Sequence, residues 1–243
     1  MCTLEKRGNI FFLTLTGDGA DEHRLNPTLI ASIRTALAEA KSQSTRGTVL
    51  ITVADGKFFS NGFDLSWAKS AACGSPSEAV NLLRHMVDLF KDVVADLISL
   101  PMPTIAAVTG HAAAAGLMLA MSHDYVLMRR DRGILYMSEV DIGMTLPDYF
   151  TALVRSKVAR PEVRRDVLLR GVRVKAEEAV AKGLVDSAHD SGEKAVEAAV
   201  RLGDEFAKRK WDGEVYAEIR KALYPELIGL LGLATRSVVK ARL

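Results

Sequence analysis

Two short apolar runs rich in β-branched residues, each followed by a turn of small residues, constrain the fold of this chain most. They are residues 48–55 (TVLITVAD) and 104–110 (TIAAVTG), with a long amphipathic segment, residues 77–100, between them. Runs of this kind are typical of strands buried in an α/β sheet. The amphipathic segment predicts a helix that stops at Pro101 and Pro103, because proline cannot continue a helix.

Strands and helices alternate in the first half of the sequence, and helices dominate the second half. Asn26 and Pro27 predict a helix start, because asparagine is a good N-cap and proline suits the first helical position. This pattern suits a single α/β core followed by a helical C-terminal segment. Further strands are predicted at 8–17, 125–130 and 133–137, and further helices at 158–171, 175–185, 193–210 and 214–240.

The composition of the 243 residues argues against several classes of protein. With 49% hydrophobic residues, the chain can bury a sizeable core without metals or disulfides. The near balance of 32 basic and 30 acidic residues argues against a broad nucleic-acid-binding surface. Cys2 and Cys73 are far apart and have no Cys or His beside them at ligand spacing, so neither a disulfide framework nor a zinc site is expected. No apolar run approaches the ~18 residues of a membrane span, and residues 1–17 lack the pattern of a secretory signal.

Two segments of small residues that follow the buried strands are candidates for binding an oxyanion. Residues 58–65 (FFSNGFDL) follow the first strand, and residues 110–118 (GHAAAAGLM) follow the second. Small side chains let a ligand approach the main chain, and the amides that open a helix are free donors. Each segment alone also fits an ordinary loop or a tight helix–sheet contact. Together they suggest a two-amide oxyanion hole.

Glu139 is the candidate proton-transferring group. It lies in the segment 136–143 (YMSEVDIG), among apolar neighbours and just after a predicted strand. Burial would raise its pKa towards the working pH, as a proton-shuttling base requires. A glutamate that caps a helix or forms a salt bridge is the alternative interpretation. His111, His123 and His189 have no partner at the spacing of a nucleophile or a metal ligand, so a hydrolase triad or a metalloenzyme is not supported.

These three segments, in this order and spacing, resemble the crotonase (enoyl-CoA hydratase/isomerase) superfamily over about residues 5–190. In that family, a motif like FSAGxDL and a motif like GxxxGGGxxLAxxxD supply the oxyanion-hole amides, which correspond here to Phe63 and Ala115. Residues 175–186 (KAEEAVAKGLVD) resemble a further helix and loop of the family. The resemblance implies a crotonase-like spiral of ββα units as the α/β core, residues 1–190. The helical segment 191–243 would then serve in oligomerisation or cover the active site.

Met118 is the most informative departure from the family's pattern. Hydratases of the family have one glutamate at this position and a second near Glu139, and the pair activates water. Methionine cannot transfer a proton, and residues 138–143 (SEVDIG) resemble the corresponding stretch of the enoyl-CoA isomerases. The resemblance therefore implies a Δ3,Δ2-enoyl-CoA isomerase of fatty-acid β-oxidation, in which Glu139 alone moves a proton from C2 to C4.

The resemblance also implies contacts with a coenzyme A thioester and no metal or redox cofactor. Residues 113–115 are alanines where the family often has glycines, and their methyl groups are expected to narrow the acyl slot. Lys57 is a candidate phosphate contact, although a solvated lysine in a turn is an equally good interpretation. Structural roles are preferred for Asp141 and Asp148, and Asp64 is expected to cap or orient its loop rather than react. The residues expected at the substrate are Lys57, Ser60, Asn61, Gly62, Asp64, Leu65, Gly116 and Met118.

The C-terminal tripeptide Ala241-Arg242-Leu243 keeps the small, basic, leucine pattern of the peroxisomal address. Together with the resemblance, it predicts a peroxisomal protein recognised by the import receptor. Relatives commonly form trimers or pairs of trimers through their C-terminal helices, and the apolar tail at 227–239, expected to be helical, would support such packing. Two alternatives stay open: another crotonase-type reaction, such as hydration or thioester hydrolysis, and a catalytically silent acyl-CoA-binding protein.

Overall fold

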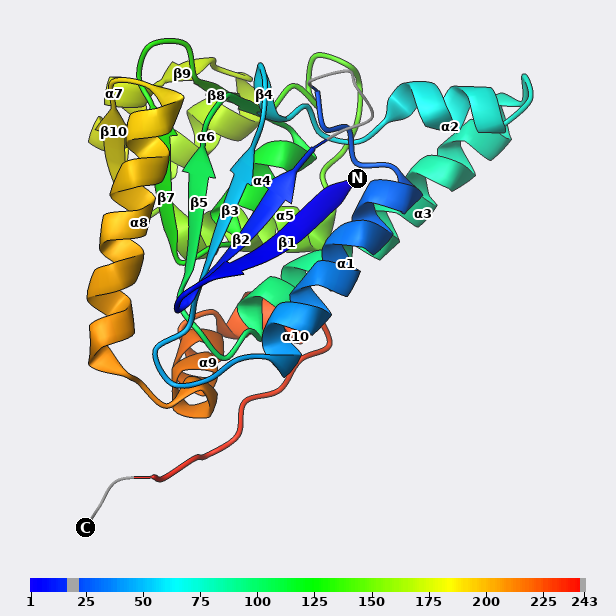
Figure 1. Cartoon of the computed structure of the whole chain (residues 1–243). Coiled ribbons are helices and arrows are strands. Elements are labelled where there is room, and N and C mark those ends of the chain that lie inside the picture. The colour runs from blue at the N-terminus through cyan, green and yellow to red at the C-terminus, as the bar shows by residue number, and fades with distance from the viewer. Residues whose placement is uncertain (17–21, 241–243) are drawn as a thin grey trace.

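The strands of this computed structural model, which describes residues 1–16 and 22–240, form two sheets (Figure 1). The larger sheet has the order β1-β2-β3-β5-β7-β10, and the smaller has the order β4-β6-β8-β9. β1 pairs with β2, and β8 with β9, in antiparallel fashion, whereas all other neighbours are parallel. The strands are β1 (Cys2–Arg7), β2 (Ile10–Leu15), β3 (Val49–Ala54), β4 (Phe58–Ser60), β5 (Thr104–Val108), β6 (His111–Ala113), β7 (Tyr125–Arg129), β8 (Ile134–Tyr136), β9 (Val174–Lys175) and β10 (Ser187–His189).

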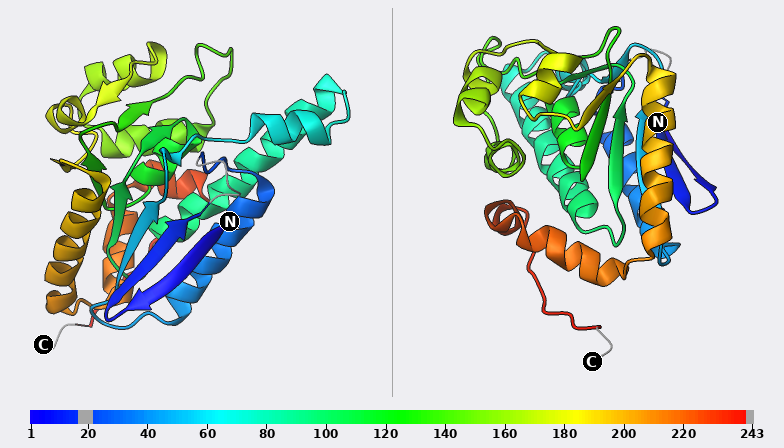
Figure 2. Two further views of the ribbon diagram at one scale, coloured as in Figure 1. Left: turned by 45° about the horizontal axis from the view of Figure 1, so that its top comes forward. Right: turned by 90° about the vertical axis from the view of Figure 1, so that its left-hand side faces the viewer.

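Helices cover both faces of the larger sheet. α8 lies along one face, and α1 and α3 lie on the other, so the sheet is enclosed between them (Figure 2). In the described part of the chain, none of the helices is long and apolar enough to cross a membrane. The helices are α1 (Pro27–Ser42), α2 (Leu65–Ala71), α3 (Pro76–Ile98), α4 (Ala115–Met121), α5 (Asp148–Lys157), α6 (Pro161–Leu169), α7 (Ala176–Ala181), α8 (Gly192–Arg209), α9 (Gly213–Ala222) and α10 (Pro225–Leu230).

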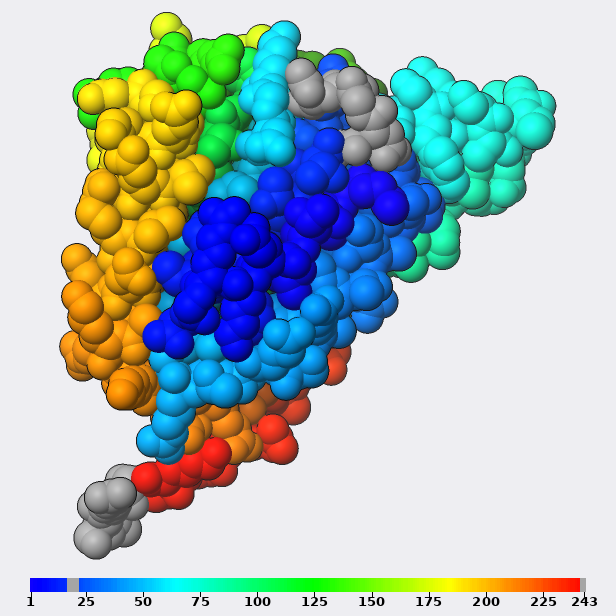
Figure 3. All heavy atoms as spheres, in the orientation of Figure 1, coloured from blue at the N-terminus to red at the C-terminus, as the bar shows by residue number. Residues whose placement is uncertain are grey.

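The first long helices begin and end where their sequences indicate. The side chain of Asn26 caps α1 by accepting a hydrogen bond from Leu29 N at 3.0 Å, as predicted. α3 is capped by Ser75 and ends at Ile98, shortly before Pro101. α2 and the start of α3 form an arm that projects from the body of the molecule (Figure 3).

The sequence predicts a helix that continues to Lys240, and for the C-terminal tail this prediction is wrong. α10 ends at Leu230, and Gly232 has φ +69°, the left-handed conformation that commonly terminates a helix. The rest of the described tail is extended rather than helical. Arg236 N donates to a Glu218 carboxylate oxygen on α9 at 2.7 Å. Beyond α10 the tail thus makes polar contacts with α9 instead of continuing as a helix, and its predicted role in oligomer packing stays a prediction.

Candidate active site

Three loops leave the smaller sheet at the same edge. β4, β6 and β8 are neighbouring parallel strands, so their carboxyl ends lie together. Residues 61–63, 114–115 and 137–139 follow these three strands directly. The backbone N–H of Ala114 donates to the Tyr136 carbonyl oxygen at 2.9 Å, which joins the second loop to the end of β8. The fold therefore gathers at one edge the three segments that the sequence marks as candidates for chemistry.

The first two loops are in close contact because glycines leave room for them. A β-carbon at Gly62 would lie 2.9 Å from Ala114 Cβ and 3.3 Å from the backbone nitrogen of Ala115. A β-carbon at Gly116 would lie only 2.2 Å from the Ser60 carbonyl oxygen. A larger residue at either glycine would push the two loops apart.

The backbone amides of Phe63 and Ala115 donate no hydrogen bond to any residue in 1–16 or 22–240. The adjacent amides are used within the fold, since those of Asp64 and Ala114 donate to carbonyl oxygens at 3.2 and 2.9 Å. Ala115 is fully buried, and a buried amide without an acceptor is rare unless a ligand supplies one. Two unpaired donors on contacting loops are what an oxyanion hole requires.

Glu139 is buried and keeps one carboxylate oxygen unpaired. The residue is 8% exposed, and its Oε2 has no hydrogen-bond partner in the described part of the chain. Met144 N donates to the Glu139 carbonyl oxygen at 2.9 Å and so fixes the turn. Burial raises the pKa of the Glu139 carboxyl, and the backbone amides of Glu139 and Ser138 oppose this only in part. A buried carboxyl with a raised pKa and one unpaired oxygen is suited to accept and release a proton.

Comparison with known proteins decides the family. The sequence profile described as "Enoyl-CoA hydratase/isomerase" matches residues 8–224. The chain belongs to the enoyl-CoA hydratase/isomerase family. It is 65% identical over 237 residues to the protein named enoyl-CoA delta isomerase 2, peroxisomal, of Arabidopsis thaliana, and the match covers 97% of each chain. It is 61% identical over 239 residues to Arabidopsis enoyl-CoA delta isomerase 3, covering 98% of each.

The fold of the family is also found among solved structures. The probable enoyl-CoA hydratase EchA3 of Mycobacterium tuberculosis superposes with a TM-score of 0.82 at 22% identity, covering 95% of this chain and 91% of that one. At this identity the likeness concerns the fold alone. The predicted α/β fold and the predicted crotonase membership are both confirmed. The division of the chain at residue 190 stays a prediction, and the family match runs across it.

Within this enoyl-CoA hydratase/isomerase chain, Met118 is a buried core residue of α4. It is fully inaccessible to solvent and belongs to the main apolar cluster. The two other carboxylates considered from the sequence, Asp141 and Asp148, are exposed, and Asp148 is the first residue of α5. Of these candidate acids, only Glu139 is buried.

Several residues predicted to contact substrate have structural partners. Asp64 accepts a hydrogen bond from Trp67 N at 2.9 Å and caps α2, which confirms its predicted capping role. Ser60 is fully buried, and its hydroxyl donates to the His23 carbonyl oxygen at 2.8 Å. Asn61 and Leu65 are half-buried on either side of the first oxyanion loop. Their contacts with substrate stay predictions.

Lys57 has cationic neighbours that the sequence alone did not indicate. Lys57 is exposed, with Nζ 5.5 Å from the centre of the Phe58 ring. Burial lowers the pKa of His111, and the charges of Lys57, Arg132 and Arg173 lower it further, so all three lie near this ring. His111, the first residue of β6, is thus surrounded by cations from three distant parts of the sequence. The spacing of residues along the sequence could not predict this group.

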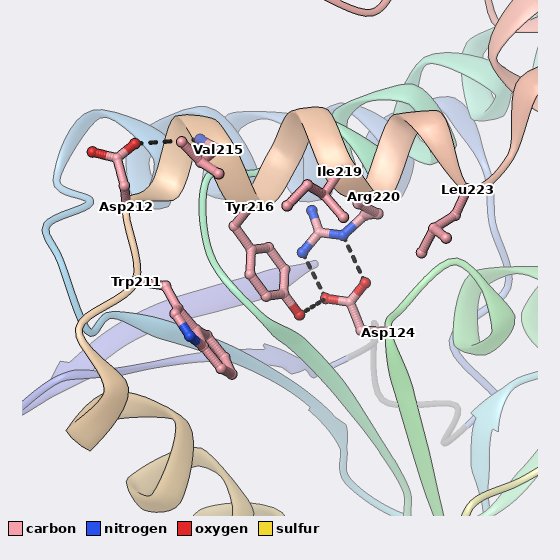
Figure 4. Close-up of a pocket in the computed structure, with 8 residues that line it drawn as sticks. All are labelled: Asp124, Trp211, Asp212, Val215, Tyr216, Ile219, Arg220 and Leu223. Carbon is pink, nitrogen blue, oxygen red and sulfur yellow. Dashed lines mark hydrogen bonds and ion pairs between the residues drawn. The ribbon is translucent and has the colours of Figure 1, made fainter. Parts of the chain in front are cut away.

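A separate cavity of about 310 Å³ lies beside α9, away from the three loops. Figure 4 shows Arg220 and Tyr216 of α9 pointing at Asp124, at the end of the loop before β7. None of the predicted site residues lines this cavity, whose lining residues are Asp124, Trp211, Asp212, Val215, Tyr216, Ile219, Arg220 and Leu223.

Proposed function

We propose that this chain is an enoyl-CoA delta isomerase that converts 3-enoyl-CoA into trans-2-enoyl-CoA. The observation that carries the proposal is the buried, unpaired carboxylate oxygen of Glu139, at the sheet edge where Phe63 and Ala115 offer unpaired amides. The two relatives at 65% and 61% identity are both enoyl-CoA delta isomerases by name.

The proposed mechanism uses one carboxylate and two amides. The thioester oxygen accepts hydrogen bonds from the Phe63 and Ala115 amides, and the Glu139 carboxylate takes a proton from C2. The electron pair left at C2 spreads over the thioester oxygen and C4, and each preorganised donor stabilises this dienolate by about 3 kcal/mol. Protonated Glu139 then gives the proton to C4, so the double bond moves from C3–C4 to C2–C3. No metal or redox cofactor takes part.

Met118 favours isomerisation over hydration. Adding water across a double bond requires a second group that positions and deprotonates the water. Met118 is apolar at the place where hydratases of the family carry a glutamate. One carboxylate is sufficient for a proton shuttle between two carbons of the same substrate.

A product assay tests the proposal. Purified protein would be given a 3-enoyl-CoA, while conjugated 2-enoyl-CoA is followed by absorbance and 3-hydroxyacyl-CoA by mass. Conjugated product without hydration is expected. Hydrated product would mean that another group activates water and that the chain is a hydratase. Tight acyl-CoA binding without turnover would indicate a catalytically silent binding protein.

The raised pKa of Glu139 predicts an acid limb in the pH profile of isomerisation. Because Glu139 must be ionised to accept a proton, kcat/KM is expected to rise with pH through the raised pKa and to level off above it. The midpoint should lie above the ordinary glutamate pKa of about 4.3. Initial rates under first-order conditions between about pH 4 and 8 measure it. A profile that is flat down to about pH 4 would exclude Glu139 as the base.

The coenzyme A phosphates are proposed to bind near Lys57. Lys57, Arg132 and Arg173 form no ion pair with a carboxylate of the described residues, and all three lie near His111. Unpaired cations gathered from separate loops are suited to a pyrophosphate or a phosphate monoester.

Peroxisomal residence is proposed from the relative that carries this location in its name and from the tripeptide Ala241-Arg242-Leu243. The tripeptide lies outside the described residues. A fluorescent fusion that ends in this tripeptide should be imported into peroxisomes, whereas the same fusion without residues 241–243 should stay in the cytosol. Import of the truncated fusion would count against receptor recognition through the tripeptide.

A homotrimer or hexamer is proposed from an exposed apolar pair at the C-terminal end of α9, Ile219 and the C-cap residue Leu223. Ile219 is 59% exposed and Leu223 is 65% exposed, one helical turn apart. Apolar residues grouped in this way are typical of protein interfaces. The double change Ile219→Asp and Leu223→Asp is expected to lower the mass measured by light scattering to that of the 26.4 kDa monomer. Leu169→Asp, at a residue 70% exposed on α6, is the control, and a monomeric unmodified protein would refute the proposal.

A further inference from the structure

Ala114, between the two candidate oxyanion amides, has a backbone conformation that normally requires glycine. Its φ is 52° and its ψ is −127°, and it is the residue that precedes α4. Lys210 also has a positive φ, but its ψ of 41° places it in the ordinary left-handed helical region. Ala114 lies outside that region, where a β-carbon collides with the main chain. The backbone at Ala114 is therefore strained.

Hydrogen bonds on both sides hold this conformation in place. The Ala114 N–H donates to the Tyr136 carbonyl oxygen at 2.9 Å. The Ala114 carbonyl oxygen accepts from Leu117 N at 3.0 Å and from Met118 N at 3.2 Å. Because the peptide groups before and after Ala114 are both fixed, the strain cannot relax by rotation of the chain.

The Ala114 methyl group occupies the space that a side chain at Gly62 would need. A β-carbon at Gly62 would lie 2.9 Å from Ala114 Cβ, closer than two such atoms approach in practice. Phe63 follows Gly62, and Ala115 follows Ala114, so this close approach of the two loops lies next to the peptide units that carry the unpaired amides. Ala114 is half-buried, unlike the fully enclosed Ala115.

We propose that Ala114 is a positioning residue for the reaction, whose methyl group sets the separation between the Phe63 and Ala115 amides. The inference rests on the proposed function. Glycine at this position would remove the strain, but it would also remove the contact that holds the Gly62 loop away from α4. The two amides must both reach one oxygen atom, and a misplacement of about 1 Å can reduce a rate by roughly 100-fold. A strained alanine therefore serves the geometry of the oxyanion hole at the expense of stability.

The variant Ala114→Gly tests both the strain at Ala114 and the role of its methyl group in setting the separation of the two amides. The thermal midpoint is expected to rise, because relief of the strain outweighs the greater freedom of glycine in the unfolded chain. The kcat for 3-enoyl-CoA is expected to fall about tenfold, with KM changed less than about twofold, because the loops lose their spacing but keep their donors. The matched control for stability is Ala113→Gly. Ala113 is 2% exposed and has no positive φ, so the loss of its methyl should lower the midpoint.

A second test transfers the methyl group from residue 114 to residue 62. Gly62→Ala should lose most activity, because its new β-carbon meets Ala114 Cβ at 2.9 Å and because Gly62 has φ +75°, which strains any side chain. Gly62→Ala combined with Ala114→Gly removes that collision, and it should recover part of the lost activity and stability. Independent effects of the two changes would contradict the contact.

The outcomes separate this inference from the proposed function. If the unmodified protein does not isomerise 3-enoyl-CoA, the proposed function fails and this role fails with it. If the unmodified protein is active and Ala114→Gly keeps its kcat, the positioning role alone is overturned. A lower thermal midpoint for Ala114→Gly would show that Ala114 is not strained, which would also overturn it.

Discussion

Glu139→Gln is expected to reduce kcat for 3-enoyl-CoA isomerisation by about 10²- to 10⁴-fold, the usual contribution of a positioned acid or base. Glutamine has nearly the same shape as glutamate but cannot take a proton from C2. The amides of Phe63 and Ala115 are untouched, so the thioester oxygen keeps both of its donors. The affinity for a non-reactive acyl-CoA, measured by calorimetry, should therefore change little.

The same substitution should not destabilise the protein at neutral pH. The pKa of Glu139 is raised in the folded state, because burial disfavours the ionised carboxylate more than the neighbouring backbone amides favour it. Stability linked to such a group is fully present below its unfolded-state pKa and is lost as pH rises through its folded-state pKa. Glutamine is neutral throughout and escapes this loss. Glu139→Gln should thus unfold at the same temperature as the unmodified protein or higher near pH 7, and the difference should close near about pH 4.

Asp141→Asn is the matched control for Glu139→Gln. Asp141 lies in the same turn, but it is exposed. Its substitution removes one carboxylate within two residues of Glu139 and should leave kcat within about twofold, as is usual for surface changes. A Glu139→Gln variant with near-normal kcat, or an equal loss in Asp141→Asn, would show that the proton is moved by another group.

The parts of the site that could be predicted from the sequence are those that depend on a short segment of neighbouring residues. Phe63 and Ala115 each lie in a segment with small residues that follows a buried strand. Small side chains leave the main-chain amides accessible to a ligand, and their position in the sequence marks the end of the strand. Glu139 stands out because its neighbours are apolar, and the structure does bury it. The strand register then brings the three segments to one edge.

The parts that could not be predicted depend on contacts between distant segments. β1 is largely exposed and charged, so it lacks the apolar alternation that marked β2. β10 has only three residues and is recognisable only by its pairing with β7. Arg132 and Arg173 act on His111 together with Lys57 only in the folded chain. Residues 233–240 contain the β-branched Thr235, Val238 and Val239, which suit the extended tail better than the helix that their apolar character suggested.

The attachment of α9 to the core also could not be predicted from the sequence. It depends on Asp124, which directly precedes β7. In the structure its carboxylate accepts two hydrogen bonds from Arg220, from Nε at 2.6 Å and from Nη2 at 2.6 Å. The two residues are separated by 96 positions. The Arg220 guanidinium also donates to the carbonyl oxygens of Leu97, Ile98, Leu100 and Met102 at the end of α3.

Arg220→Met is expected to destabilise the protein by about 3–5 kcal/mol, the usual result of removing one partner of a buried ion pair. The Arg220 side chain is 3% exposed and that of Asp124 is 11% exposed. Methionine fills much of the volume but leaves Asp124 without its countercharge and the carbonyl oxygens at the end of α3 without their donor. At roughly 2–4 °C per kcal/mol for a chain of this size, the thermal midpoint should fall by about 6–20 °C.

Arg155→Met provides the matched control, because it makes the same change in an exposed pair. Arg155 donates to both carboxylate oxygens of Glu226, but the two side chains are 47% and 53% exposed, so a loss of about 0–1 kcal/mol is expected.

Burial by itself would raise the pKa of Asp124, yet the charge and hydrogen bonds of Arg220 outweigh it and lower that pKa. The stability from this pair is therefore present above the unfolded aspartate pKa of about 3.9 and lost as pH falls through the folded-state value. The gap between the unmodified protein and Arg220→Met should be widest near neutral pH and narrow in acid. Equal losses for Arg220→Met and Arg155→Met would mean that burial does not distinguish the two pairs, and that α9 is held by its apolar contacts instead.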